Sequence, residues 1–162
     1  MNKLSKVHKN LRGFTLIELL VVIGILGILL AIVLIAINPA RQFAQADNTK
    51  RSSDTAALLN AVHQYAADHR GRLPANMPAR GAAAASISST GANICADISP
   101  TYLSLLPSDP EAANGGVGVS DCAVAYDTEY TVAVDSSGRV TVSAPNTDTT
   151  VTDSGTVISV TR

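Results

Sequence analysis

Apolar residues are distributed very unevenly along the chain. Residues 19–37 form a run of 19 positions without a charged or strongly polar side chain. At 1.5 Å per residue, such a run makes a helix of roughly 28 Å, which is close to the thickness of the hydrocarbon core of a bilayer. The pattern therefore predicts one membrane-spanning helix near the N-terminus, and the rest of the chain is typical of a soluble domain.

A second, amphipathic helix is predicted over residues 39–70. Pro39 separates it from the apolar helix, because proline lacks an amide hydrogen and crowds the preceding turn. The segment contains an apolar stripe with spacings of three and four: Ala56, Leu59, Val62, Tyr65, Ala66 and His69. Two oppositely charged pairs spaced by four residues also support a helix, namely Asp47–Arg51 and Lys50–Asp54. The two helices together are too long for one small domain, so the N-terminal half needs lipid or other subunits as partners.

The C-terminal half changes from helical to alternating patterns. Residues 71–121 are rich in glycine, proline, alanine and serine without a sustained period, which predicts a loop region with short helical pieces near 82–86. Alternation begins at residue 122 and predicts an antiparallel sheet to residue 162, with a hairpin turn at 135–138. The alternating segments are residues 122–126, 130–134, 140–144 and 156–161.

These elements predict an α+β fold class. A long N-terminal helix, with a transmembrane half and an amphipathic half, packs on a small head built around an antiparallel β-sheet. The predicted division of the chain is a basic leader over 1–13, an apolar helix over 14–38, an amphipathic helix over 39–70, a loop region over 71–121 and a sheet over 122–162.

Charge and side-chain chemistry argue for a structural role. From residue 71 onward the chain has 4 basic and 9 acidic residues, so the head is acidic and nucleic-acid binding is not indicated. Asp127 and Glu129 share a strand face, where calcium binding is an alternative to a solvated face. His63 and His69 lack metal-ligand spacing and are interpreted as surface or packing residues. No nucleophile–base pair, phosphate loop or zinc spacing is present, so we expect neither an enzyme nor a cofactor or metal.

The segment before the apolar helix orients it in the membrane. Its basic residues have no acid among them: Lys3, Lys6, Lys9 and Arg12. This bias keeps the N-terminus cytoplasmic and sends the following domain across the membrane. A secretory signal peptide is the alternative, but it has a shorter apolar core and a small residue after that core. Here the small residue, Gly13, precedes the run.

The hexapeptide after the leader is Gly13-Phe14-Thr15-Leu16-Ile17-Glu18. With its basic leader and apolar helix, it resembles the class III signal of type IV pilins and pseudopilins. The resemblance implies the pilin fold, cleavage after Gly13 by a prepilin peptidase, and methylation of the new N-terminal amine of Phe14. It implies a precursor inserted in the cytoplasmic membrane, which an inner-membrane platform and its ATPase then assemble into an extracellular filament.

The resemblance also gives roles to three residues of the apolar helix and its end. Glu18 pairs with the amine of Phe14 inside the filament and sets the register of assembly, because a buried carboxylate is tolerated only when it is paired. The alternative is a helix-end carboxylate that faces water or lipid headgroups. Gly27 and Pro39 match a glycine and a proline between which the pilin helix loosens on assembly, although glycine also serves close packing alone.

Two cysteines complete the set of candidate residues, Cys95 and Cys122. Because the domain is expected outside the cytoplasm, we expect a disulfide between them. It closes a loop of 28 residues and contributes roughly 3–4 kcal/mol in the chain-entropy model. The alternative is two free, buried thiols.

The sequence thus predicts a pilin, the structural subunit of an extracellular type IV pilus made of identical copies. The alternative is a pseudopilin of a type II secretion system, or a minor pilin that initiates assembly or captures a ligand. The short head with its "LPSDP" segment favours the alternative, and the Ser/Thr-rich C-terminal strand region favours the pilin. The tasks expected of such a filament are adhesion, motility or secretion.

Overall fold

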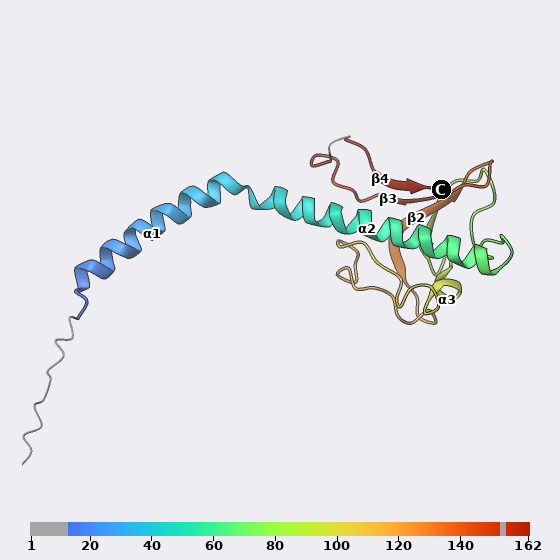
Figure 1. The fold of residues 1–162 in the computed structure, drawn as a ribbon, viewed down its shortest axis with the longest axis horizontal. Helices are drawn as coiled ribbons and strands as arrows, with labels where there is room; N and C mark the ends of the chain where they lie inside the picture. Colours follow the sequence, from blue (N-terminus) through green and yellow to red (C-terminus); the bar gives the residue numbers. More distant parts are fainter. Residues whose placement is uncertain (1–12, 153–154) are drawn as a thin grey trace, which may run out of the picture. The chain divides into compact units, whose positions relative to one another are not determined.

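The computed structural model describes residues 13–152 and 155–162, and the chain divides at Pro39 into two compact units. The first unit holds the apolar helix. The second unit, Ala40–Arg162, is called the head below. Figure 1 shows the elements of both units, and each unit is described by itself. The predicted basic leader, apart from Gly13, lies outside the described residues.

Helix α1 spans Leu16–Ile37, and none of its 22 residues is buried. Thr15 is its N-cap, and Asn38 at its C-cap adopts the left-handed conformation, with φ 45° and ψ 80°. Asn38 precedes Pro39, and the proline ring disfavours a right-handed helical conformation at the residue before it. The helix therefore ends at Ile37, two residues before the proline.

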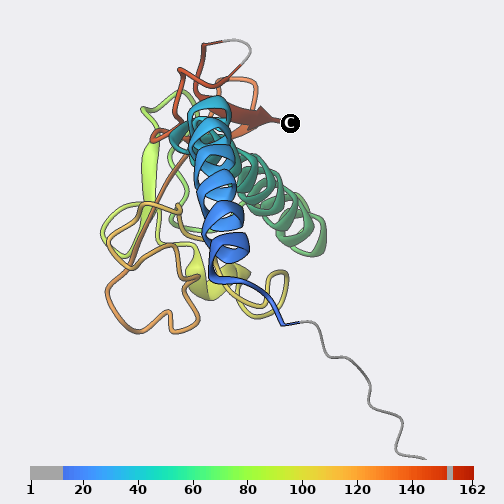
Figure 2. The same ribbon diagram turned by 90° about the vertical axis from the view of Figure 1, so that its left-hand side faces the viewer.

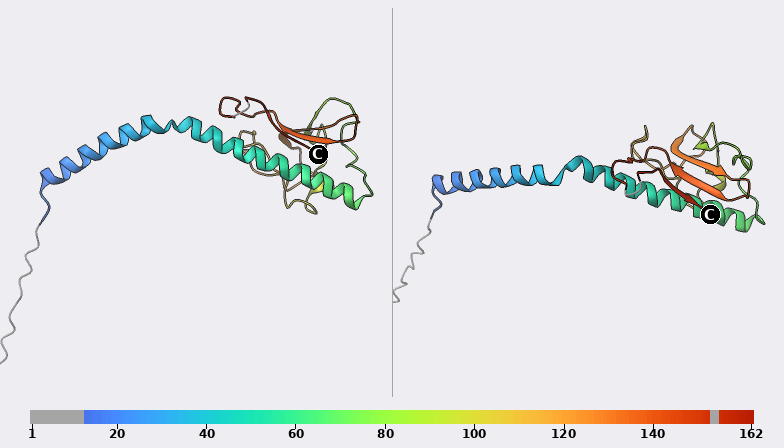
Figure 3. Two further views of the ribbon diagram at one scale, coloured as in Figure 1. Left: turned by 45° about the horizontal axis from the view of Figure 1, so that its top comes forward. Right: turned by 90° about the horizontal axis from the view of Figure 1, so that it is seen from above.

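Helix α2 spans Pro39–Asp68 and begins on proline, which the first helical position tolerates because its missing amide hydrogen would have no partner there. Leu58, Leu59 and Val62 of this helix belong to the apolar core of the head. All of its buried side chains are Asn48, Arg51, Thr55, Leu58, Leu59, Ala61, Val62 and Ala66. The left-hand view of Figure 3 shows α2 beneath one face of the sheet. The predicted stripe is correct at Leu59, Val62 and Ala66, but His69 is exposed and the buried Arg51 and Leu58 lie outside it.

The sheet has four antiparallel strands in the order β1-β2-β3-β4. Their bounds are Ala85–Ser88 for β1, Asp127–Val134 for β2, Val140–Ala144 for β3 and Ile158–Thr161 for β4. In β2 every second residue from Thr128 to Val134 is buried, which is the pattern of a strand with one face on a core. A long apolar helix with a small antiparallel sheet confirms the α+β fold class.

Two local predictions are wrong. Residues 82–86 are not helical, because this segment leads into β1, which pairs with β2 so that Ala85 faces Val132. Residues 122–126 are not a strand: residues 122–124 form a turn, in which the Asp121 carboxylate accepts a hydrogen bond from the Ala123 amide at 2.9 Å, and residues 125–126 are irregular. The sheet therefore draws one strand from the region predicted as loop.

The connection between β1 and β2 lies on the side of the head opposite to β4, as Figures 1 and 2 show. It contains the short helix α3, Cys95–Ile98. The apolar core joins all of these parts: Leu58, Leu59 and Val62 of α2 pack with Ile98 of α3 and with buried valines of β2 and β3. The core thus fixes the connection and the sheet on α2.

Candidate functional site

The residues of the predicted cleavage site are accessible. Gly13 and Phe14 precede α1 in irregular structure, and the Phe14 side chain is 78% exposed. A Cβ atom at Gly13 would meet no atom within 4 Å, so the fold of this chain does not itself require glycine there. A requirement for glycine at this position would therefore come from a processing enzyme, whose cleft accepts a backbone without a side chain.

Glu18 and Thr15 form a reciprocal cap at the start of α1. The Thr15 hydroxyl accepts a hydrogen bond from the Glu18 amide at 3.2 Å, and the Glu18 carboxylate accepts the Thr15 amide at 3.1 Å and the Thr15 hydroxyl at 3.0 Å. A carboxylate in the first turn also faces the positive end of the helix dipole. The Thr-x-x-Glu spacing is a recognised capping signal, so this role of Thr15 was readable in the sequence and was missed.

The surface of α1 is apolar on all sides. Its leucine, isoleucine and valine side chains are exposed by 48–85%, and none of its residues is buried. Within the described residues, α1 is the helix that is long and apolar enough to cross a membrane. So much exposed apolar surface requires lipid or protein around it. The helix also continues without interruption through Gly27, so in the single chain the break is confined to Asn38 and Pro39.

Cys95 and Cys122 are joined by a disulfide, with 5.5 Å between their Cα atoms. Cys95 belongs to α3 and is fully buried, and Cys122 lies in the turn before β2. The bond encloses the segment that contains Leu106–Pro110. It therefore restrains both ends of the long connection that crosses the head.

A buried ion pair holds the same connection on α2. The Arg51 guanidinium donates to both oxygens of Asp109, from Nε at 2.7 Å and from one terminal nitrogen at 2.9 Å, and the two side chains are 1% and 0% exposed. It also donates to Glu111 at 2.9 Å and to the Asn48 side chain at 3.1 Å. The predicted Asp47–Arg51 pair is replaced by these contacts, whereas the predicted Lys50–Asp54 pair is present at 2.7 Å.

The ion pair changes the protonation of both partners. Burial by itself raises the pKa of Asp109, but hydrogen bonds from Arg51 and from the Glu111 amide, with the charges of Arg51 and Lys50, lower that pKa below its ordinary value. The hydrogen bonds to Asp109 raise the pKa of Arg51 further, against the effect of burial. Asp109 is thus an anion at neutral pH, and it depends on Arg51 for its charge balance.

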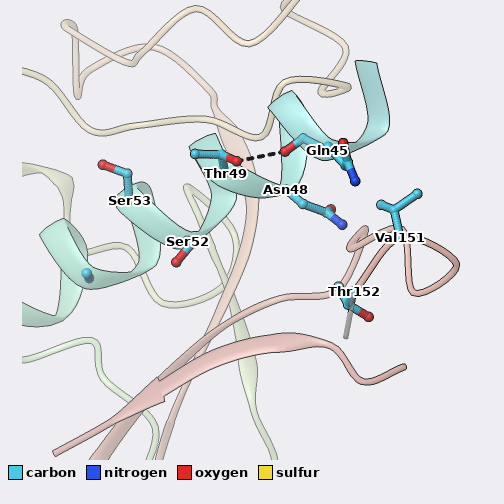
Figure 4. A pocket seen from close by; sticks show the side chains of 8 residues that line it. Gln45, Asn48, Thr49, Ser52, Ser53, Val151 and Thr152 are labelled. Carbon is cyan, nitrogen blue, oxygen red and sulfur yellow. Dashed lines mark hydrogen bonds between the residues drawn. The ribbon is translucent and has the colours of Figure 1, made fainter. Parts of the chain in front are cut away.

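The turn of α2 that carries Arg51 also holds the loop between β3 and β4. The Asn48 side chain donates to the Asp148 carbonyl at 2.8 Å and accepts from the Asp148 amide at 3.1 Å. Figure 4 shows Asn48 pointing toward the side of this loop where Val151 and Thr152 lie. Asn48, Val151 and Thr152 all line an open groove of about 860 Å³. One helical turn therefore fixes two loops that are distant in the sequence.

The residues considered for metal binding do not form a ligand set. The Asp127 carboxylate accepts hydrogen bonds from the Ser86 hydroxyl and the Glu129 amide, both at 2.9 Å. Among residues 13–152 and 155–162, no group of three or more His, Cys, Asp or Glu side chains is arranged to hold a metal ion. His69 stacks on the Tyr65 ring with centroids 3.9 Å apart, and no bond joins it to His63.

Comparison with known proteins identifies the N-terminal segment. Residues 8–34 match the family model described as the prokaryotic N-terminal methylation motif. No match to the chain was found among curated proteins or among solved structures. The matched residues span the junction of Gly13 and Phe14, the Glu18 cap and most of α1. Residues 8–34 of this chain therefore carry the methylation motif, in agreement with the resemblance of this segment to the class III signal of type IV pilins and pseudopilins.

Proposed function

We propose that the chain is a pilin, the structural subunit of an extracellular type IV pilus, which polymerises through α1 after its leader is removed. The observation that carries this proposal is the combination of the methylation motif with a helix that has no buried residue in its own chain. A motif of this kind implies processing by prepilin peptidase and assembly into pilus-type filaments. The exposed α1 supplies the apolar surface that such assembly would bury.

Processing takes place at Gly13 and Phe14. The peptidase cleaves after Gly13 on the cytoplasmic side of the membrane, and the amine of Phe14 is then methylated. The accessibility of both residues supports this assignment. Cleavage also removes the basic leader, which holds the precursor in its orientation in the cytoplasmic membrane.

Glu18 provides the counter-charge for the new amine. Its carboxylate accepts the amide hydrogen of Thr15, which directly follows Phe14, so the amine arises one residue from a group already bonded to Glu18. When α1 leaves the lipid for the interior of a filament, a carboxylate and an amine that neutralise each other cost much less than either charge alone. The pair, within one subunit or between neighbours, thereby selects one register of assembly.

The remaining partners follow from the same model. An inner-membrane platform with its ATPase extracts the mature chain from the membrane, and identical copies of α1 then surround one another in a helical filament. Gly27 and Pro39 bound the part of the helix that loosens during this transfer. Asn38 supports this idea, since the helical path is already interrupted at that residue in the single chain.

A pseudopilin of a type II secretion system, or a minor pilin, is the competing function. The "LPSDP" segment favours it, and the structure shows that this segment is held on α2 through Asp109. Quantitative mass spectrometry of sheared surface filaments separates the two functions. A pilin is the most abundant protein of the filaments, and deleting its gene abolishes them. Filaments in which the chain is absent or present in a few copies would instead support the competing function.

A further inference from the structure

All basic residues that follow Arg51 in the sequence are arginines, and all lie at one end of the head. We name this surface the arginine end: Arg70, Arg72, Arg80, Arg139 and Arg162. All five are exposed. Between Arg80 and Arg139 the chain has no basic residue, and the other cations of the head are Arg41, Lys50 and Arg51 of α2. Lys50 and Arg51 are engaged in ion pairs with Asp54, Asp109 and Glu111.

The contacts of the head place these arginines together. Two contacts show that helix α2 runs in the same direction as β2. Arg51 contacts Asp109, in the segment beside the start of β2. Asn60 lies further along α2 and accepts a hydrogen bond from Arg162 at 3.0 Å. Arg162 pairs through its main chain with Val140, the first residue after the β2–β3 turn. Gly138 belongs to that turn, and the Arg80 side chain lies against it. A Cβ atom on Gly138 would be 3.2 Å from the guanidinium carbon of Arg80. Figure 1 shows this turn and the C-terminal end of α2 at the same end of the head.

The opposite end of the head is acidic. We name it the acidic end: Asp121, Asp127, Glu129 and Asp148. Glu111 lies nearby but is paired with Arg51 at 2.9 Å, so it is not counted. Asp121, Asp127 and Glu129 surround one hollow of about 350 Å³ at the start of β2. The eight residues of β2 separate this hollow from the β2–β3 turn by roughly 25 Å.

The arginine end is not neutralised within its own head. Asp135 is paired with Arg139 at 2.7 Å, and Asp68 accepts the hydroxyl hydrogen of Tyr102. Within residues 13–152 and 155–162, no carboxylate pairs with Arg70, Arg72 or Arg80. The fifth member, Arg162, donates a hydrogen bond to the uncharged amide oxygen of Asn60. This contact does not neutralise the charge of its exposed guanidinium group.

We propose that the two ends form a head-to-tail contact, in which the arginine end of one copy meets the acidic end of a second copy. The proposal rests on the pilin function proposed above. Arginine binds carboxylates through two parallel hydrogen bonds, which lysine cannot do. A contact between two different surfaces of one molecule does not close on itself, and its repetition generates a helical filament.

The composition of the acidic end fits a protein partner better than a polyanion. Val124 lines the hollow and is 60% exposed, so the charged rim surrounds apolar surface, as in protein interfaces. A nucleic acid or another anionic polymer would account for the arginine end alone, and the four carboxylates of the acidic end would repel it. A second copy of the chain accounts for both surfaces and fixes the axial register of the heads.

Charge reversal in the full-length chain tests the contact. The first variant reverses the arginine end (Arg72→Glu, Arg80→Glu), and the second reverses the acidic end (Asp121→Lys, Glu129→Lys). We expect each alone to reduce the yield of sheared filaments by about tenfold or more, because like charges then face each other. Their co-expression, or all four changes in one chain, should restore the yield to within about threefold of wild type. Arg72→Lys with Arg80→Lys is the charge-conserving control, and the near-ultraviolet signal of the tyrosines verifies folding.

The outcomes separate this contact from the pilin function. Unchanged filament yield after either reversal, or no restoration by the combination, would overturn the contact and leave the pilin function intact. If the wild-type chain forms no filaments at all, the pilin function fails. The contact is then read from full-length chains in detergent micelles at low salt. The tagged first variant should retain more of the second variant than of untagged first variant. Equal amounts of the two retained chains would overturn the contact.

Discussion

Replacing Arg51 by methionine removes both hydrogen bonds that a guanidinium donates to the buried Asp109. The substitution keeps much of the length of the side chain but leaves a fully buried carboxylate with the Glu111 amide as a remaining donor, at 3.0 Å. Removing one partner of a buried ion pair costs about 3–5 kcal/mol, since the other charge stays buried without compensation. We expect a loss of that size in the free energy of unfolding of the head.

The double variant Arg51→Met with Asp109→Leu separates the pair from its surroundings. Replacing both charges by apolar side chains of similar volume is often neutral or stabilising. The double variant should therefore recover most of the stability that the single variant loses. Arg139→Met is the control, because the Arg139–Asp135 pair lies at the surface, with side chains 66% and 31% exposed, and such pairs contribute about 0–1 kcal/mol.

Urea unfolding of the full-length chain in detergent micelles measures these changes. The chain has four tyrosines and no tryptophan, and all four tyrosines lie in the head, so near-ultraviolet circular dichroism reports the head alone. If Arg51→Met costs no more than Arg139→Met, the ion pair does not have the burial and geometry described here.

The pH dependence of unfolding provides a second test of the same pair. The pKa of Asp109 is lowered in the folded head from an ordinary value of 3.8. A lowered carboxylate pKa stabilises the fold above the ordinary value, and this stabilisation is lost as the pH falls through the folded value. The gap between wild type and Arg51→Met should thus be full at neutral pH and should narrow below about pH 4. A gap that stays constant down to about pH 2 would contradict the assignment.

Three further predictions concern processing, assembly and the disulfide. Gly13→Leu should leave the leader attached, because the peptidase cleft requires a bare backbone; an immunoblot that shows full cleavage would refute it. Glu18→Ala should preserve membrane insertion, because a polar cost is removed, and should abolish or slow filament formation; normal filament amounts would show that Glu18 sets no register. Replacing Cys95 and Cys122 by alanine should destabilise the head by about 3 kcal/mol in the same urea assay, and an effect below about 1 kcal/mol would argue against a stabilising disulfide.

The sequence predicted those elements that depend on local patterns. The apolar run defined α1, Pro39 marked its end, and alternation defined the β2–β3 hairpin. The partner of Arg51 could not be predicted from local sequence patterns. Asp47 has the helical spacing, whereas Asp109 is 58 residues away and becomes a neighbour only when the connection folds onto α2. Helical spacing therefore predicts a pair with Asp47, but the three-dimensional fold pairs Arg51 with Asp109.

Strand β1 shows the same limit. Its residues, Ala-Ser-Ile-Ser, carry one large apolar side chain, Ile87, and lie in a segment without a period. The strand exists because β2 offers an edge for pairing, some 40 residues further along the chain. In the N-terminal segment the situation is the reverse, since the cleavage and capping residues lie within six consecutive positions and can be read without the fold.

The N-terminal peptide of the protein in purified surface filaments tests the central claim most directly. Tandem mass spectrometry should show a chain that begins at Phe14, with one methyl group on its α-amine and the sequence Phe-Thr-Leu-Ile-Glu intact. A filament protein that retains residues before Phe14, or one cleaved after the apolar run, would contradict the account. The first would place the leader inside the assembly, and the second would remove α1, the surface through which we propose that the subunits polymerise.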